Sequence, residues 1–195
     1  MPPIDDAEVA IRAALTRGDV REAIRLLLAT YGPELRAYLL ANVRDRERAK
    51  ELESELGEQL LSSLPRFRGD SSVRTYVYAI AWNVVRHDRR RARRARDAEP
   101  ISEGDPRFVA PGERTRTPAF RRTTARLRLE AARASLAPDE LNLLVLRVDR
   151  QMPWSEIGAI LGTGTSAAAT AVLRKRFERL VQRLRRSVLE PDDGG

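Results

Sequence analysis

Apolar residues recur every three or four positions along most of the chain, and few segments alternate apolar and polar residues as a half-buried strand would. The sequence therefore predicts an all-α protein. Breaks are expected at Arg17-Gly18-Asp19 and at Gly32-Pro33. Asp19 and Asp45 are candidate N-caps. The helices expected before the first long connector are Asp5–Thr16, Val20–Tyr31, Glu34–Val43 and 47–63.

A long helix is expected after the connector 64–69, with Ser71 or Ser72 as its N-cap. Its core-facing stripe is predicted to hold Val73, Val77, Ile80, Ala81 and Val84. A spacing of four places Arg74, Tyr78 and Trp82 on one face, which the pattern puts away from that stripe. Large aromatic side chains on a face away from the core need a functional explanation.

Apolar periodicity disappears between Asp97 and Pro118, where proline and glycine recur. A flexible linker and a domain boundary are expected there. Order returns near Thr123 with a helix through Leu136, and Pro138 opens the next helix. Ser155 is expected to cap a short helix, which the turn at 162–164 joins to a helix running from about Ser166 to Arg186. Two such helices around a glycine turn are typical of a helix-turn-helix.

The net charge of the chain indicates what kind of partner it binds. The formal net charge is +8 and the pI is near 10.8, which favours a polyanionic partner such as nucleic acid. There is no cysteine, so disulfides and thiolate metal sites are excluded. Neither a signal-peptide pattern nor an apolar run of about 20 residues is present. We therefore expect a cytoplasmic protein without a cofactor or a metal and without membrane insertion.

The stretch "VRTYVYAIAWNVVRHDRRRARRAR" concentrates three of the ten aromatic residues beside a run of arginines. Flat rings can stack on unpaired bases, an amide can read a base edge, and guanidinium groups can hold phosphates. The alternative is that the aromatic rings pack against neighbouring helices and the arginines are solvated. We favour nucleic acid, with eight candidate contacts: Arg74, Tyr76, Tyr78, Trp82, Asn83, Arg86, Arg89 and Arg90.

The predicted helix-turn-helix presents small residues and then basic ones at the start of its second helix. Small side chains there could touch thymine methyl groups, and the basic residues suit phosphates. An ordinary pair of core helices with a basic outer face is the alternative. The candidate contacts to duplex DNA are Ser155, Ser166, Ala169, Thr170, Val172, Arg174, Lys175 and Arg176.

The helix 47–63 is acidic, with Glu51, Glu55 and Glu58 on one face. A solvated surface or a docking site for a basic protein surface is expected there rather than catalysis. His87, the one histidine of the chain, belongs to the basic face. Because no base–nucleophile pair or acidic metal motif is recognisable, no enzymatic activity is expected.

Two separated blocks resemble one family. "LPRFRGDSSVRTYVYAIAWNVVRHDRRR" resembles the promoter-melting segment of sigma-70 family RNA polymerase sigma factors, in particular the small extracytoplasmic-function type. "SLAPDELNLLVLRVDRQMPWSEIGAILG" with "VLRKRFERLVQRLR" resembles their helix-turn-helix domain, with Gly158 where alanine is usual. The resemblance implies two helical domains joined by a flexible linker, and covers most of the chain.

The resemblance divides the chain into a 1–30 N-terminal helical extension, a 31–97 region 2-like domain, a 98–122 linker, a 123–190 region 4-like domain and a 191–195 disordered tail. It implies that the first domain docks on core RNA polymerase and melts the minus-ten element, and that the second reads the minus-thirty-five element. The docking residues it implies are Glu51, Leu52, Ser54, Glu55 and Glu58. Ser54 and Gly57 depart from the family's usual glutamine and phenylalanine, so an altered polymerase contact is expected.

The function predicted from the sequence is therefore that of a sigma factor that binds core polymerase and promoter DNA, both duplex and single-stranded. An anti-sigma factor is a possible further partner. A stand-alone helix-turn-helix regulator that binds only duplex DNA is the main alternative. An enzyme acting on nucleic acid is a third hypothesis, against which the lack of cysteine and of a metal motif stands.

Overall fold

The computed structural model describes residues 4–98 and 128–189, and all regular structure in these ranges is helical. The prediction of an all-α protein with two helical parts is confirmed. The first part consists of α1 (Ile4–Thr16), α2 (Val20–Val43), α3 (Arg46–Ser63), the short 3-10 helix η1 (Leu64–Arg66) and α4 (Val73–Ala98). Nearly all of the predicted linker 98–122 and the whole predicted tail 191–195 lie outside the described residues.

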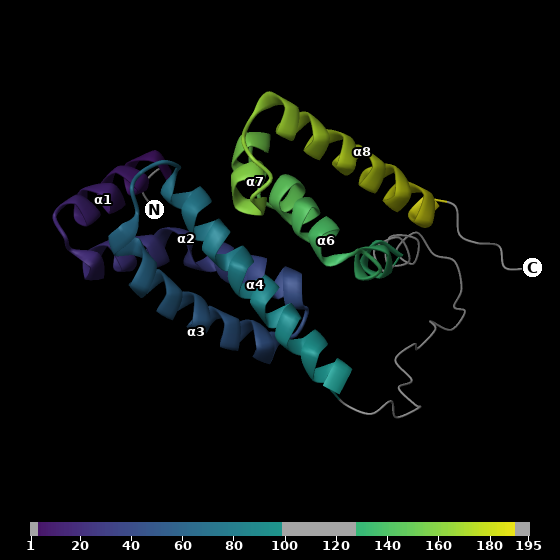
Figure 1. The fold of residues 1–195 in the computed structure, drawn as a ribbon, viewed down its shortest axis with the longest axis horizontal. Helices are drawn as coiled ribbons and strands as arrows, with labels where there is room; N and C mark the ends of the chain where they lie inside the picture. The colour runs from purple at the N-terminus through teal and green to yellow at the C-terminus, as the bar shows by residue number, and fades with distance from the viewer. Residues whose placement is uncertain (1–3, 99–127, 190–195) are drawn as a thin grey trace, which may run out of the picture.

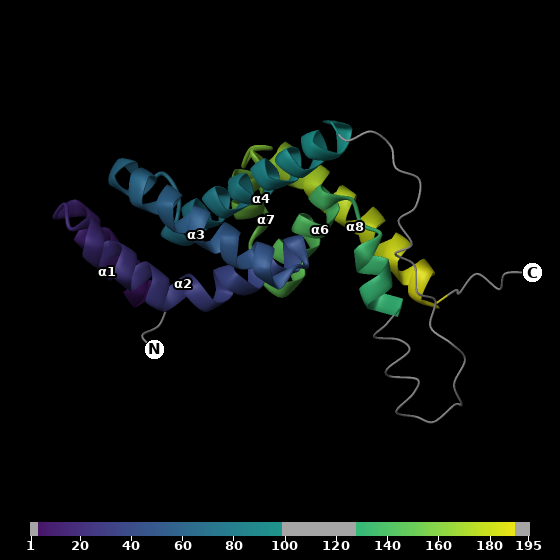
Figure 2. The ribbon, with the colours of Figure 1, turned by 90° about the horizontal axis from the view of Figure 1, so that it is seen from below.

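The second part begins with a helical segment at 128–134 and continues with α6 (Pro138–Leu144), the π-helical segment η2 (Val145–Asp149), α7 (Trp154–Leu161) and α8 (Ala167–Leu189). Figure 1 shows α1, α2 and α3 gathered around α4, with α6, α7 and α8 beyond it. In the turned view of Figure 2, α7 lies beside α4. The helix α4 is therefore flanked by both parts of the chain.

Local sequence accounts for several helix starts. The carboxylate of Asp19 accepts a hydrogen bond from the Glu22 amide at 3.0 Å, and Asp45 accepts one from the Arg48 amide at 2.9 Å. Ser72 caps α4 by accepting from the Thr75 amide at 3.0 Å. Each cap satisfies an amide that the first turn of a helix leaves without a partner. The predicted caps of α2, α3 and α4 are thus confirmed.

The predicted break at Gly32-Pro33 was wrong, because α2 continues through it from Val20 to Val43. Pro33 removes one amide donor from the helix, and its ring normally clashes with the Cβ atom of the residue before it. Gly32 has no Cβ atom, so this clash is reduced. Tyr31, Gly32 and Leu35 are all buried, and their packing offsets the lost hydrogen bond.

The second part contains the expected helix-turn-helix. Gly162 (φ 69°) and Gly164 (φ 94°) adopt left-handed backbone conformations between α7 and α8. Trp154 of α7 and Phe177 of α8 meet edge to face, with ring centroids 5.5 Å apart. Ser155 was expected to cap α7, but the N-cap position is Pro153 and Ser155 lies exposed in the first turn. The proline fits there because the first turn of a helix needs no amide donor from it.

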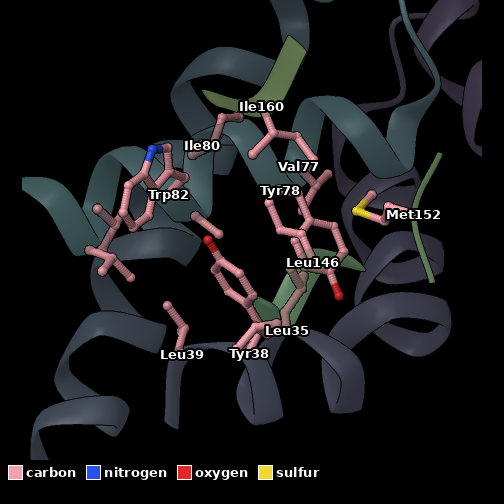
Figure 3. Packing of buried hydrophobic residues seen from close by; sticks show 14 of the residues in the cluster. Leu35, Tyr38, Leu39, Val77, Tyr78, Ile80, Trp82, Leu146, Met152 and Ile160 are labelled. Carbon is pink, nitrogen blue, oxygen red and sulfur yellow. The ribbon is translucent and has the colours of Figure 1, made fainter. Parts of the chain in front are cut away.

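Side chains from both parts form one apolar cluster. Figure 3 shows Val77, Tyr78 and Ile80 of α4 facing Leu146, Met152 and Ile160 of the second part. The expectation that Tyr78 and Trp82 lie away from the core was wrong: their exposed fractions are 0 % and 2 %. The helix α4 is enclosed on more than one side, so its buried surface is wider than a single stripe.

Gly158 offers a test of the helix-turn-helix geometry. A Cβ atom on Gly158 would lie 2.1 Å from the carbonyl oxygen of Gly164, so the turn would have to move. We expect Gly158→Ala to lower the free energy of unfolding by about 1–3 kcal/mol, as overpacking does. Gly57→Ala is the matched control, because nothing lies within 4 Å of its added Cβ atom. The control should raise stability by about 1 kcal/mol. Urea unfolding followed by circular dichroism measures both, and equal effects would contradict the close approach.

Candidate nucleic-acid interface

The solvent-facing side of α4 carries amide and guanidinium groups. Asn83, Arg86 and Arg90 are exposed and lie along the helix at intervals of three and four residues. Arg89 is half-buried and donates a hydrogen bond to the Asn42 carbonyl at 2.9 Å. The guanidinium of Arg89 also lies over the Trp82 ring, 5.6 Å from its centroid. Of the predicted contacts on this helix, Asn83, Arg86 and Arg90 thus lie on an open surface.

Arg74, Tyr78 and Trp82 lie on the covered side of α4. Arg74 forms an ion pair with Glu34 of α2 and donates a hydrogen bond to the Arg150 carbonyl of the second part at 3.2 Å. The Tyr78 ring meets the Tyr38 ring edge to face at 5.0 Å. Burial, with Glu34 nearby, raises the pKa of Tyr78, so this residue is neutral. In this arrangement, the predicted aromatic face is not open to a base.

Tyr76 is half-buried at the start of α4 and lies close to the connector 67–72. Its hydroxyl donates to the Ser63 carbonyl at 3.0 Å, and its ring packs against Phe67 at 4.8 Å. These contacts fix the connector between η1 and α4. The side chain of Tyr76 is therefore held by its neighbours and remains partly exposed.

The helix α1 contacts the same connector, an arrangement that no pattern in the sequence predicted. Glu8 accepts a hydrogen bond from the Val73 amide at 2.8 Å and so caps α4 from a distant part of the chain. Arg12 pairs with Glu8, donates to the Ser71 carbonyl at 2.6 Å and lies over the Phe67 ring at 5.3 Å. The spacing of Glu8 and Arg12 indicates an ion pair on α1, but it does not indicate that this pair contacts the connector.

The second candidate surface is the outer face of α8. Its predicted contacts are exposed or half-buried, with Val172 65 % exposed. Ser166 caps the helix by accepting from the Ala169 amide at 3.2 Å. Arg174, Lys175 and Arg176 follow on exposed positions. An exposed apolar side chain beside cations matches the surface needed to enter a duplex groove.

The acidic helix α3 presents only part of its predicted docking set. Leu52 was expected to contact a partner, but it is fully buried against the core. Glu55 pairs with Arg91 at 3.2 Å and lies 3.7 Å from His87, so it joins α3 to α4. Glu51 pairs with Arg48 on its own helix. Glu58 and Ser54 are exposed. The open acidic surface is thus narrower than the sequence pattern indicated.

Arg48 makes a further link between these helices, because it also pairs with Asp88 of α4. Asp88 is buried at 7 % exposure, so its charge is compensated inside the first part. Among the described residues, no group of three or more His, Cys, Asp and Glu side chains could hold a metal ion. In the same ranges, no helix is long and apolar enough to cross a membrane.

Comparisons with known proteins identify the first part. Residues 27–95 match the model of the Sigma-70 region 2 family, a range that includes most of α2, the whole of α3 and most of α4. The chain therefore contains a Sigma-70 region 2 domain, in agreement with the resemblance that the sequence indicates. The chain is 28 % identical to the RNA polymerase sigma factor YlaC of Bacillus subtilis (strain 168) over 158 residues, which span 81 % of this chain and 90 % of YlaC.

A solved structure has the same fold. The sigma factor RpoE from Bartonella quintana, in complex with the anti-sigma factor NepR, superposes with a TM-score of 0.61 at 17 % identity. The match covers 87 % of this chain and 98 % of that chain, so both helical parts are included. A sigma factor is a transcription factor without catalysis of its own, which agrees with the expectation that the protein is not an enzyme.

The contacts of Glu8 on α1 give a second testable prediction. We expect Glu8→Ala to lower the free energy of unfolding by about 1 kcal/mol, because it removes the cap on the Val73 amide and the partner of Arg12. Glu47→Ala is the control, since that side chain pairs with Lys50 on the exposed surface of α3. Thermal unfolding of the full chain measures both variants. Equal losses would show that the capping contact does not stabilise α4.

Proposed function

We propose that this protein is a sigma factor, which directs core RNA polymerase to specific promoters and helps to part the DNA strands at initiation. The observation that carries the proposal is the exposed row of Asn83, Arg86 and Arg90 on α4, within the stretch that matches Sigma-70 region 2. An amide at one end and guanidinium groups along the helix suit a displaced strand, whose bases and phosphates are both accessible.

In this proposal, each helical part binds a different promoter element. The region 2-like part (31–97) takes the minus-ten element as single strand, and the region 4-like part (123–190) holds the minus-thirty-five element as duplex through α8. Binding energy supports melting because contacts of Asn83, Arg86 and Arg90 with the displaced strand offset the base pairs that are lost. The protein acts in the cytoplasm, where the polymerase and the promoter are.

Core polymerase is the proposed partner of α3, through the exposed Glu51, Ser54 and Glu58. These side chains form an anionic edge that suits a basic surface. YlaC is named as an RNA polymerase sigma factor, and this relationship supports the same partner here. The complex of RpoE with NepR supports an anti-sigma factor as a further partner.

Run-off transcription tests the proposal directly. Core polymerase should produce specific transcripts from a library of promoter fragments only when the full chain is added. The alternative is a stand-alone regulator that uses only α8. Such a protein would bind duplex DNA, and its addition would produce no new transcript. Polymerase that starts at the same sites with and without the protein would contradict the proposed function.

The arginines of α4 should contribute to the salt dependence of binding to single-stranded DNA. Each lost phosphate contact reduces the slope of log K against log salt by about 0.7 on a single strand. We expect Arg86→Ala with Arg90→Ala to reduce it by about 1.4. Arg25→Ala is the control, since Arg25 pairs with Glu22 on α2. Fluorescence anisotropy of the sigma factor with core polymerase measures the slopes, and an unchanged slope in the double variant would exclude phosphate contacts there.

A further inference from the structure

The orientation of α8 is fixed by one buried stripe. Leu173, Leu180 and Leu184 are buried, and they hold the helix against α6 and α7 (Figure 1). Phe177 lies on the same stripe and meets the Trp154 ring of α7 edge to face. Because these contacts determine which side of α8 is covered, they also determine which side chains of the helix face the solvent.

The solvent-facing side of α8 begins with apolar residues. Ala168, Ala171 and Val172 point away from the buried stripe, and all three are exposed. Val172 is 65 % exposed, and among the large apolar side chains of the described residues only Val9 is more exposed. An exposed valine between two small residues stabilises nothing within the folded chain, so its side chain is free to contact a ligand.

The same two turns contain no side chain that could form a bidentate hydrogen bond with a base. Residues 167–173 include no amide, carboxylate or cationic group. The Thr170 hydroxyl donates to the Ala167 carbonyl at 3.0 Å, and the Ser166 hydroxyl accepts from the Ala169 amide at 3.2 Å. Guanine and adenine are normally recognised by bidentate hydrogen bonds, so neither matches the start of this helix.

Thymine differs from the other bases in what it presents to the major groove. It is the one standard base with a methyl group there, and that group makes apolar contacts. An apolar side chain against any other base edge would displace water from donors and acceptors without replacing their hydrogen bonds. Since the second helix of a helix-turn-helix enters the groove with its N-terminal residues, Val172 is placed to meet a thymine.

The surroundings of Val172 allow this contact. Ala168 and Ala171 add only methyl groups to the helix surface, so the backbone can approach the base edges closely. Arg174 and Lys175 are exposed one turn further along α8, where cations suit the phosphates that border the groove. The cations thus provide affinity for any duplex, and the apolar start of the helix provides a preference among bases.

We propose that Val172 reads the 5-methyl group of a thymine in the major groove, and that Ala168 and Ala171 permit the close approach this contact needs. The duplex element bound by α8 therefore contains thymine at the position that faces Val172. The inference rests on the proposed function only for naming that element the minus-thirty-five element. The preference for the methyl group is a property of α8 itself.

Competition binding with the full chain tests the contact. A fluorescein-labelled duplex of alternating A and T is displaced by the same unlabelled duplex, or by one with uracil in place of thymine, which lacks only the methyl groups. The thymine duplex should bind roughly fourfold more tightly, as expected for one buried methyl group. Val172→Ala should reduce this ratio to about one, because the shorter side chain no longer reaches the methyl group.

Val9→Ala is the matched control, because Val9 is 67 % exposed and lies on α1 in the other helical part. It should keep the full preference for thymine. Since both valines are exposed, both variants should unfold at the temperature of the unsubstituted chain. Equal affinities for the thymine and uracil duplexes, or a full preference in Val172→Ala, would overturn the proposal.

Methylated cytosine separates the methyl contact from the shape of an A·T duplex. An alternating G·C duplex with 5-methylcytosine carries a methyl group at the same place in the major groove, and should bind more tightly than its unmethylated form. No gain from this methylation would assign the thymine preference to duplex shape and overturn the proposal. Failure of the run-off assay with an intact methyl preference would contradict the proposed function and leave the inference for Val172 standing.

Discussion

The fully buried ring of Tyr78 lies where the two helical parts pack together. Its ring meets Tyr38 of α2 edge to face, and Leu146 and Met152 of the second part close over it. Burying an aromatic ring and its aliphatic neighbours contributes several kcal/mol, of the order of 2 per side chain. That gain holds two parts of the chain together across the segment 99–127.

The same packing decides which chemistry is available at the surface. Since the face of α4 with Arg74 and Tyr78 is enclosed, the open contacts are the amide of Asn83 and the guanidinium groups beyond it. The outer face of α8 remains open in the same arrangement. In this arrangement the proposed duplex-reading surface is open, while the face of α4 that carries Tyr78 and Trp82 is covered.

Two contacts between residues far apart in the sequence position α4 within the first part. Glu8 caps its first turn from α1, and Arg48 of α3 pairs with the buried Asp88 near its middle. Neither contact involves one of the candidate DNA-binding residues. The precision of the interface therefore depends on side chains that would not touch nucleic acid, because a helix keeps its orientation only if its neighbours hold it.

Most of the helices, the caps at Asp19, Asp45 and Ser72 and the helix-turn-helix could be predicted from the sequence, because they depend on local periodicity, side-chain hydrogen bonds and a contiguous turn. The tertiary structure alone decided that α2 runs through Pro33, that Leu52 is buried and that Tyr78 and Trp82 lie inside. A spacing of four places residues on one face of a helix, but cannot say how many faces the neighbours will cover. The number of covered faces follows only from the packing of the two parts, since burial is a property of the assembled chain.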